Sequence, residues 1–197
     1  MAGKRVGSPL GVTLVAMVLA GLITALVLSF VLEDDETAGP PALTLAPGAG
    51  DGTIPPGELE GEPAPDFTFE PLTGGADIDF DTFRAGRPAL INFFYNGCVP
   101  CVVEMPDLED AFERYGDQVA FLGLSSAESV RAGRELVERT GVTYDIGRDP
   151  NGDIITAFAG GGYPTTVFIA ADGTITTSHL SQIHPDELRD ELDGLLA

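Results

Sequence analysis

The stretch that decides the fold is Ala-Leu-Ile-Asn-Phe-Phe-Tyr-Asn-Gly-Cys-Val-Pro-Cys, residues 89–101. Residues 89–94 form a nearly continuous apolar run, which is typical of a strand buried on both faces of a sheet. A helical pattern follows over residues 99–115. The two cysteines of the chain, Cys98 and Cys101, therefore lie at a strand-to-helix junction, where a Cys-x-x-Cys motif strongly indicates redox chemistry.

The position of Cys98 at a helix start favours its thiolate form. Unpaired backbone N–H groups and the positive end of the helix dipole lie there, so we expect its pKa to fall below the free value of about 8.5. Cys101 lies inside the first turn and is close enough to resolve a mixed disulfide. Pro100 stiffens this turn without removing a needed hydrogen bond. The pair would then work as a redox-active disulfide with no further cofactor.

Two other uses of the cysteines stay open. A structural bridge is the first, although closing so short a loop stabilises a protein by only roughly 2 kcal/mol. Half of a metal site is the second, and its other ligands would have to come from His179 and His184, far along the chain. Both histidines are otherwise expected at the surface, with His184 preceding Pro185 at a helix start. No metal is therefore expected.

The rest of the chain alternates strand and helix patterns. Alternating polar and apolar residues at 67–69 and 78–80 flank Thr73-Gly74-Gly75 and predict a β-hairpin. The remaining expected elements are strands at 118–124, 142–146, 165–169 and 174–178, and helices at 128–139, 154–158 and from Pro185 onward. Together they predict an α/β sandwich. Pro164 precedes the strand at 165–169, which indicates an edge, a turn or a cis peptide bond that presents the backbone of Tyr163.

These motifs together resemble the thioredoxin superfamily. The residues that carry the resemblance are Cys98-Val99-Pro100-Cys101, Pro106, Tyr163-Pro164-Thr165-Thr166 and Ala64-Pro65-Asp66-Phe67. More narrowly, the chain is similar to the membrane-anchored TlpA/ResA-type thiol–disulfide oxidoreductases of the redoxin (AhpC-TSA) group. The resemblance implies a three-layer α/β/α sandwich with an N-terminal β-hairpin and a central αβ insertion over residues 126–149.

The resemblance also implies roles for residues outside the Cys-x-x-Cys motif. Pro106 would kink the active-site helix. Pro164 would be a cis-proline facing the cysteines, and Tyr163, Pro164 and Thr165 would contact the substrate. Glu104 would tune the pKa of the cysteines, with a solvated helix glutamate as the alternative.

Two positions distinguish the chain from its implied relatives. Asn92 takes the place of a buried aspartate in cytoplasmic thioredoxins, and because an amide does not titrate, acid–base help would fall to Glu104 or to water. Gly97 stands where the family usually has tryptophan, and the chain has no tryptophan at all. These two positions therefore leave the choice of partner and the reduction potential undetermined. They do not change the expected thiol chemistry of the cysteines.

The N-terminal third of the chain indicates an exported, tethered domain. Residues 10–32 carry no charge, and as a helix they would reach roughly 35 Å, enough to cross a bilayer. Lys4 and Arg5 precede this run, so we expect residues 1–9 in the cytoplasm, a transmembrane anchor at 10–32, and the remainder outside. A cleaved signal peptide is the alternative. Residues 33–62 are acidic and rich in Gly and Pro, which predicts a disordered linker before a thioredoxin-like domain at 63–197.

Charge and chemistry limit the partners. The formal net charge of -21 argues against nucleic acid as a partner, because phosphates would be repelled. Protein thiols and disulfides are the expected substrates. The resemblance favours the reducing direction, toward apocytochrome c or metal-handling proteins, with re-reduction by a membrane electron donor. A disulfide-forming oxidase and a non-catalytic adaptor that senses redox state or holds metal are the alternatives.

Overall fold

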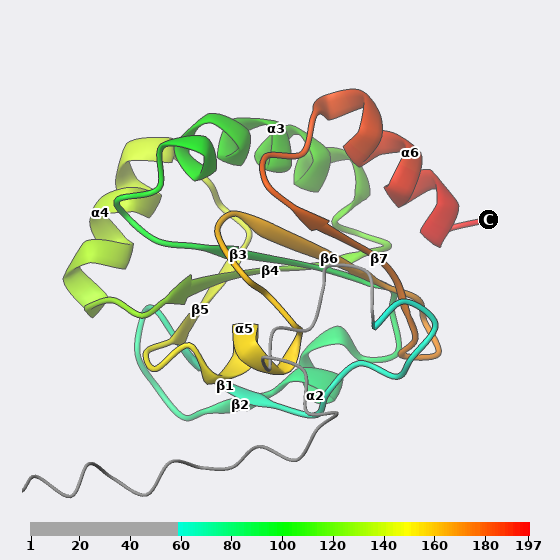
Figure 1. The fold of residues 1–197 in the computed structure, drawn as a ribbon, viewed down its shortest axis with the longest axis horizontal. Helices are drawn as coiled ribbons and strands as arrows, with labels where there is room; N and C mark the ends of the chain where they lie inside the picture. Colours follow the sequence, from blue (N-terminus) through cyan, green and yellow to red (C-terminus); the bar gives the residue numbers. More distant parts are fainter. Residues whose placement is uncertain (1–58) are drawn as a thin grey trace, which may run out of the picture. The chain divides into compact units, whose positions relative to one another are not determined.

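Seven strands form one mixed sheet in the computed structural model of the chain, which describes residues 59–197 (Figure 1). The strands are β1 (Thr68–Pro71), β2 (Ile78–Asp79), β3 (Ala89–Phe94), β4 (Ala120–Ser126), β5 (Asp145–Asp149), β6 (Thr165–Ile169) and β7 (Ile175–Leu180). Their order across the sheet is β2-β1-β5-β4-β3-β6-β7. The pairs β3–β4 and β4–β5 are parallel, and the other neighbours are antiparallel. The sheet thus has a parallel centre and antiparallel flanks.

Five helices cover the two faces of this sheet. They are α2 (Phe80–Arg84), α3 (Val99–Tyr115), α4 (Val130–Thr140), α5 (Asp153–Ala157) and α6 (Pro185–Leu195). In Figure 1, α3, α4 and α6 lie above the sheet, and α2 and α5 lie below it. This confirms the predicted α/β fold with three layers. The segment expected as an insertion contains α4 and β5.

A separate hydrophobic core lies on each face of the sheet. All six residues of β3 are buried, as expected for a central strand with layers on both sides. Leu90 and Phe94 belong to the core under α3, α4 and α6, whereas Ile91 and Phe93 belong to the core against α2 and α5. The alternation of side chains along β3 therefore fills both cores from one strand. The same strand ends four residues before Cys98.

Most elements match the sequence-based expectation, with local differences. The β1–β2 hairpin is confirmed. The short helix α2 was not expected. It begins at Phe80 because the Asp79 side chain accepts a hydrogen bond from the N–H of Thr82 (2.8 Å), which caps the helix. Strand β5 lies three residues further along the chain than expected, since Val142 and Tyr144 pack into the core before the strand begins.

The expected anchor at residues 10–32 and the linker residues 33–58 lie outside the described part of the chain. Within residues 59–197, no helix is long and apolar enough to cross a membrane. Residues 59–62, which the sequence assigns to the linker, lie against β7. There the N–H of Gly61 donates to Ile175 and the N–H of Ile175 donates to Glu62, at 2.8 and 2.9 Å.

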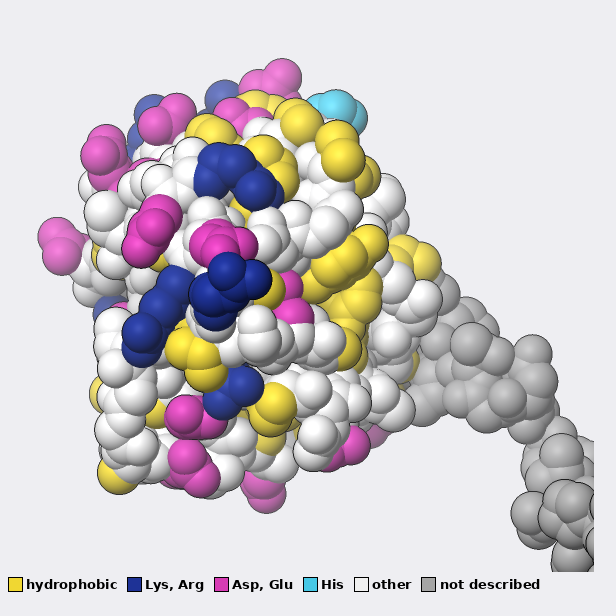
Figure 2. Space-filling model, turned by 90° about the vertical axis from the view of Figure 1, so that its left-hand side faces the viewer, with side chains coloured by type: hydrophobic (Ala, Val, Ile, Leu, Met, Phe, Trp, Pro, Cys, Tyr) yellow, Lys and Arg dark blue, Asp and Glu magenta, His cyan; other side chains and the backbone are white. Residues whose placement is uncertain are grey.

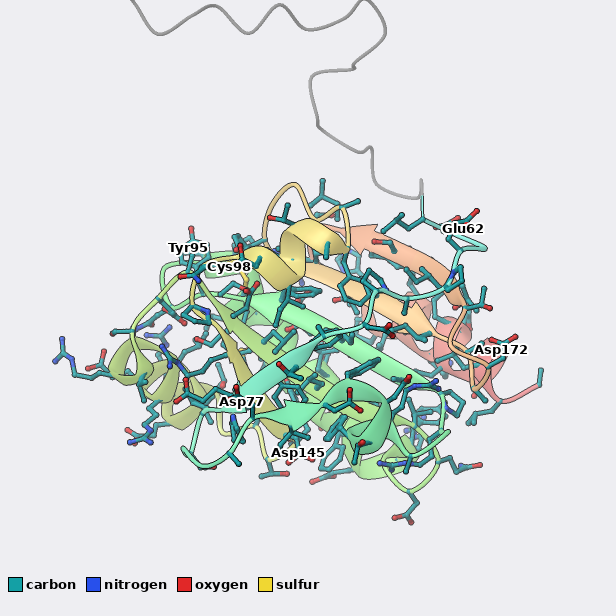
Figure 3. All side chains as sticks on the ribbon, turned by 90° about the horizontal axis from the view of Figure 1, so that it is seen from below. Glu62, Asp77, Tyr95, Cys98, Asp145 and Asp172 are labelled. Carbon is teal, nitrogen blue, oxygen red and sulfur yellow. A yellow bond between two sulfur atoms is a disulfide. The ribbon has the colours of Figure 1, made fainter. Side chains whose placement is uncertain are left out.

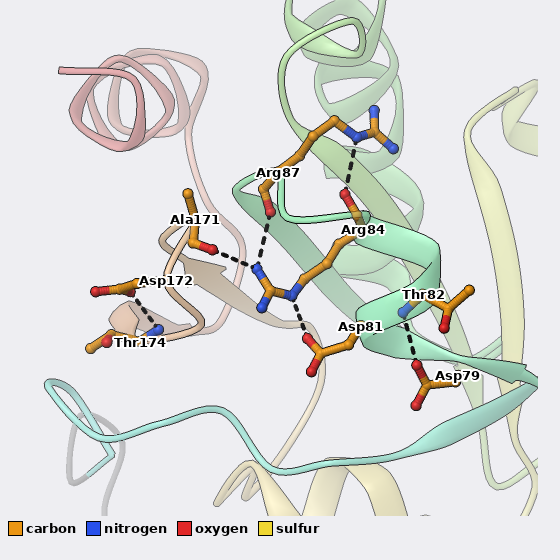
Figure 4. Close-up of polar contacts among 8 residues, drawn as sticks. All are labelled: Asp79, Asp81, Thr82, Arg84, Arg87, Ala171, Asp172 and Thr174. Carbon is orange, nitrogen blue, oxygen red and sulfur yellow. Dashed lines mark hydrogen bonds and ion pairs between the residues drawn. The ribbon is translucent and has the colours of Figure 1, made fainter.

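Polar contacts of Arg84 join α2 to the turn between β6 and β7 (Figure 4). The Arg84 guanidinium donates to the backbone carbonyl of Ala171 (2.9 Å) and to the Asp81 carboxylate (2.6 Å). Asp172, in the same turn, accepts from the N–H of Thr174 (3.0 Å). Figure 3 places Asp172 and Glu62 at one end of the domain, and Tyr95 and Cys98 at the other. We call these the entry end and the disulfide end.

Candidate active site

The two cysteines lie at the carboxyl end of the central strand, where β3 leads into α3. Cys98 is the N-cap residue of α3, with an extended backbone, and its sulfur accepts a hydrogen bond from the N–H of Cys101 (3.2 Å). The sulfurs of Cys98 and Cys101 are bonded to each other at 2.02 Å. A thiolate formed at Cys98 would thus meet a backbone donor at the positive end of a helix of 17 residues.

Both cysteines are buried, and Cys101 is the more deeply buried of the two. Cys98 retains 3% of its exposure and Cys101 retains none. Val99 and Pro100, which lie between them, are exposed on the first turn of α3. The first turn also carries no acidic side chain that would oppose a thiolate. The small exposed surface of the pair therefore belongs to Cys98.

The segment around Pro164 lies beside the cysteines. The Tyr163–Pro164 bond is cis. The ring of Tyr163 stands edge-on to the ring of Tyr95 at 5.2 Å between centroids, and the carbonyl of Tyr95 accepts from the N–H of Cys98 (3.0 Å). Tyr163 also packs against the hydrophobic core that contains both cysteines. The structure thus brings together two segments that are more than sixty residues apart in the sequence.

Glu104 is fully buried, one helical turn after Cys101. One of its carboxylate oxygens accepts from the side-chain amide of Asn92 (2.7 Å), and the other accepts from the backbone N–H of Ile183 (3.1 Å). The same amide nitrogen of Asn92 donates to the hydroxyl of Thr166 (2.9 Å). Glu104 is therefore not a solvated helix residue. It lies at the centre of a buried cluster of polar groups in the core under α3.

Burial raises the pKa of Glu104 to about 7, because the ionised carboxylate has lost its water. The hydrogen bonds from Asn92 and Ile183 act in the opposite direction, since they stabilise the ionised form, and the nearby charge of Asp107 raises the pKa further. A carboxylic acid with this pKa can both hold and release a proton near neutral pH. Glu104 lies on the buried face of α3, three residues after Cys101. Its proton is therefore held on the interior side of the disulfide.

Two buried polar atoms next to this group have no hydrogen-bond partner among the described residues. They are the amide oxygen of Asn92 and the hydroxyl of Tyr144. The charge of Glu104 helps to raise the pKa of Tyr144, so the two side chains influence each other electrostatically. Tyr144 was not expected in the site, because nothing in its local sequence distinguishes it from an ordinary core tyrosine.

The remaining expected site residues take supporting positions. Thr165 is buried, and its hydroxyl donates to the carbonyl of Gly162 (2.8 Å), which fixes the loop before Pro164. Pro106 lies inside α3 with its ring exposed, and Pro100 lies in the first turn. His184 is the N-cap residue of α6 but makes no side-chain capping bond.

The loop before Cys98 is held by the insertion, through contacts that sequence reasoning missed. The N–H of Asn96 donates to the carboxylate of Glu128 (2.9 Å). The guanidinium of Arg139 donates to the carbonyl of Asn96 (3.3 Å) and to its side-chain oxygen (3.0 Å). These contacts span more than thirty residues, so no local pattern could reveal them.

No group of three or more His, Cys, Asp or Glu side chains within residues 59–197 is arranged to hold a metal ion. His179 instead lies between two carboxylates of α6, with its ring nitrogens 3.4 Å from Glu187 and Glu191. The described residues thus offer the cysteines no further ligands.

Comparison with known proteins agrees with this geometry. Residues 61–178 match the AhpC/TSA family. The chain is 30% identical over 140 residues to the thioredoxin-like protein YneN of Bacillus subtilis, covering 70% of this chain and 81% of that protein. It is 28% identical over 122 residues to the thiol-disulfide oxidoreductase ResA of Oceanobacillus iheyensis, covering 58% of this chain and 62% of that protein.

A solved structure is similar as well. It is that of a secreted disulfide oxidoreductase of Mycobacterium tuberculosis homologous to E. coli DsbE, with a TM-score of 0.58 and 27% identity. The alignment covers 65% of this chain and 95% of that chain. The expected resemblance to redoxins is therefore confirmed for the domain that carries the disulfide.

Proposed function

Because the chain belongs to the AhpC/TSA family and is a thioredoxin-like thiol–disulfide oxidoreductase, we propose that it reduces disulfides of other proteins outside the cytoplasm. The observation that carries this proposal is the Cys98–Cys101 disulfide at the start of α3, whose small exposed surface belongs to Cys98, with the Tyr163–Pro164 segment beside it. The partners that fit this role best are proteins with a cysteine pair to be kept reduced, such as apocytochrome c or metal-handling proteins.

The reaction uses the two sulfurs and one proton carrier. In the reduced protein the thiolate of Cys98 attacks one sulfur of a substrate disulfide, a mixed disulfide forms, and the other substrate sulfur leaves as a thiolate that takes up a proton. Cys101 then loses its proton and attacks the sulfur of Cys98, which releases the second substrate thiol. Two electrons pass from the protein dithiol to the substrate, and the protein is left with its own disulfide.

Glu104 would serve the second step. The thiol of Cys101 is fully buried, so its proton needs an acceptor inside the domain. With a pKa of about 7, Glu104 can accept a proton and return it when the protein is reduced again. Asn92 supports this role by holding one carboxylate oxygen without titrating itself.

A substrate would bind against the cis-proline segment. A backbone segment beside the active site can offer its N–H and C=O groups to an extended peptide, in the manner of an added strand. Tyr163 belongs to such a segment, and Thr165 holds the preceding Gly162 in place. The substrate cysteine would then lie opposite Cys98.

Residues 10–32 would anchor the protein, with residues 33–58 as a tether and a membrane electron donor regenerating the dithiol. Support comes from the charge pattern, with Lys4 and Arg5 before the apolar run and acidic residues after it, and from the secreted relative with 27% identity. Alkaline phosphatase fused after residue 40 should be active. An inactive fusion would contradict the orientation.

The direction of electron flow is decided by the reduction potential. For the full-length chain in detergent we expect a value well below about -200 mV, because a reductase must hold its electrons weakly. A value near about -120 mV would favour a disulfide-forming oxidase. Failure of the reduced protein to cleave any protein disulfide would favour an adaptor that only senses redox state.

A further inference from the structure

Gly97 is packed against the ring of Tyr95. A Cβ atom built on Gly97 would lie 2.7 Å from Cε2 of Tyr95 and 3.4 Å from its Cδ2. Contacts below about 3.0 Å are not tolerated between carbon atoms, so any larger residue at position 97 would displace the tyrosine ring. The residue directly before Cys98 is thus small because the aromatic ring two residues earlier occupies its space.

The Tyr95 ring lies where it can meet a partner. It is 39% exposed, it stands edge-on to Tyr163, and its carbonyl holds the N–H of Cys98. The backbone of Tyr95 is held in place through the next residue, Asn96. Hydrogen bonds join the N–H of Asn96 to Glu128, and its carbonyl and side-chain oxygens to Arg139. The backbone that carries the ring is thus fixed before a partner binds, which lowers the entropy cost of packing on it.

Other exposed apolar side chains lie on the same end of the molecule. Val99 and Val103 follow Cys98 on one face of α3, at 72% and 52% exposure. Leu180, at 41%, ends β7 opposite Thr165 and lies 3.4 Å from the position of a Cβ on Gly162. Figure 2 looks onto the disulfide end and shows hydrophobic side chains gathered there beside charged ones.

Among the described residues, only one more large apolar side chain is exposed to a similar degree, namely Leu196 at 37%. It lies near the C-terminus, at the opposite side of the domain in Figure 1. Exposed apolar side chains that gather around a single point indicate a contact surface, whereas scattered ones do not. We call Tyr95, Val99, Val103 and Leu180 the apolar rim.

From these contacts we infer that Tyr95 is a specificity-determining residue, which selects substrate segments with apolar side chains next to their cysteine. The inference rests on the proposed reductase function and names the substrate class for the same site. Gly97 acts through Tyr95, because it leaves room for the ring, and is a positioning residue. The exposed aromatic surface beside the disulfide is thus supplied from position 95 and not from position 97.

The test compares two neutral peptides that differ only beside the cysteine. Each is a disulfide-linked dimer with a self-quenched fluorophore, and the cysteine is flanked by leucines in one and by serines in the other. The full-length protein in detergent is kept reduced by dithiothreitol, whose electrons pass through the protein dithiol to the peptide disulfide. The readout is the ratio of kcat/KM for the leucine peptide to kcat/KM for the serine peptide.

We expect the wild type to favour the leucine peptide, and Tyr95→Ala to lower the ratio about tenfold, as for loss of one well-placed aromatic contact. Tyr95→Phe should keep the ratio, because the ring remains. Gly97→Ala should lower the ratio about as much as Tyr95→Ala, and should have no further effect when combined with Tyr95→Ala, since the collision is then absent. Leu196→Ala is the matched control and should leave the ratio unchanged.

Each result decides the matter. A wild type that reduces both peptides equally, or a ratio that Tyr95→Ala does not change, would overturn the inference while leaving the reductase function in place. Additive effects of Gly97→Ala and Tyr95→Ala would overturn the role of Gly97. A wild type that reduces neither peptide would contradict the proposed function itself, and the inference with it.

Discussion

The disulfide end and the entry end of the domain differ in which side chains they bury and which they expose. At the entry end, Phe80 of α2 is buried, whereas Asp81 and the N-cap residue Asp79 are exposed to solvent. At the disulfide end, the first turns of α3 bury Glu104 and expose Val99 and Val103. Charged groups are rarely fully buried and clustered exposed apolar groups are unusual, so the second arrangement costs stability.

This difference indicates where the sequence serves chemistry and where it serves packing. A buried carboxyl group is tolerated when its pKa and its hydrogen bonds are useful to a reaction, which is the role we propose for Glu104. The Arg84 contacts at the entry end join α2 to the β6–β7 turn and involve no group that a redox reaction needs. Substitutions at the two ends should therefore separate activity from stability.

The largest effect is expected for Cys98→Ser. A serine hydroxyl cannot replace the thiolate as attacking group, so reduction of insulin disulfides by the full-length protein should fall by at least about a thousandfold. The measurement is the rate of insulin precipitation with dithiothreitol as the electron source. Cys101→Ser should instead accumulate a mixed disulfide, because the first step remains and the second is lost. Residual activity of Cys98→Ser within tenfold of the wild type would contradict the assignment of the nucleophile.

A second prediction concerns the buried carboxyl group. The pKa of Glu104 is raised in the folded protein from 4.5 to about 7, so the folded state binds this proton more tightly than the unfolded state does. Its contribution to stability is then fully present below about pH 4.5 and is lost as the pH rises through about 7. Glutamine cannot ionise. The free energy of unfolding of Glu104→Gln should therefore rise, relative to that of the wild type, by up to about 3 kcal/mol between pH 4 and pH 8.

Urea unfolding of the oxidised protein at a series of pH values measures this difference. Glu113→Gln, at an exposed position of the same helix, is the matched control and should follow the wild type. If the difference between Glu104→Gln and the wild type did not change with pH, Glu104 would not hold a proton in the folded protein near neutrality.

A smaller effect is expected at the entry end for Arg84→Ala. The substitution removes the hydrogen bonds to Ala171 and Asp81, and the free energy of unfolding should fall by about 1–2 kcal/mol. The rate of insulin reduction per folded molecule should stay at the wild-type value, because no contact of Arg84 reaches the disulfide. A loss of activity at full folding would show that the two ends are coupled, and would break the comparison.

The parts of the site that the sequence predicts are those built from neighbouring residues. Strand β3 and helix α3 follow from the apolar run and from helical periodicity, and the place of Cys98 follows from their junction. A cis bond at Pro164 is one of the alternatives that a proline directly before a strand allows, and it is the one that the family resemblance implies. Each of these depends on fewer than twenty consecutive residues.

The parts that the sequence could not predict depend on distant contacts. Ile183 is 79 positions from Glu104, and its N–H is an ordinary backbone donor that no pattern singles out. The sequence predicts strand β5 too early in the chain. The strand itself contains Arg148 and the buried Asp149, and such charged residues are typical of a loop. Asp149 is tolerated inside because it accepts from the N–H groups of Ile154 and Ile155 at the start of α5.

The aromatic ring at position 95 lies between these cases. An aromatic residue at position 95 and a glycine at position 97 are both visible in the sequence. Their contact is not, because it depends on the turn in which the carbonyl of Tyr95 accepts from the N–H of Cys98. Only the folded loop shows that the small residue makes room for the large one.

The central claim is that Cys98 is the reactive thiolate and that Cys101 is protected behind it. The most direct measurement is the rate at which iodoacetamide modifies each cysteine of the reduced full-length protein from pH 4 to pH 10, resolved by mass spectrometry. We expect Cys98 to react first at every pH, with a midpoint below about 8.5, and Cys101 to remain unmodified on the same timescale. Equal rates for the two cysteines, or a midpoint for Cys98 above that value, would contradict the account.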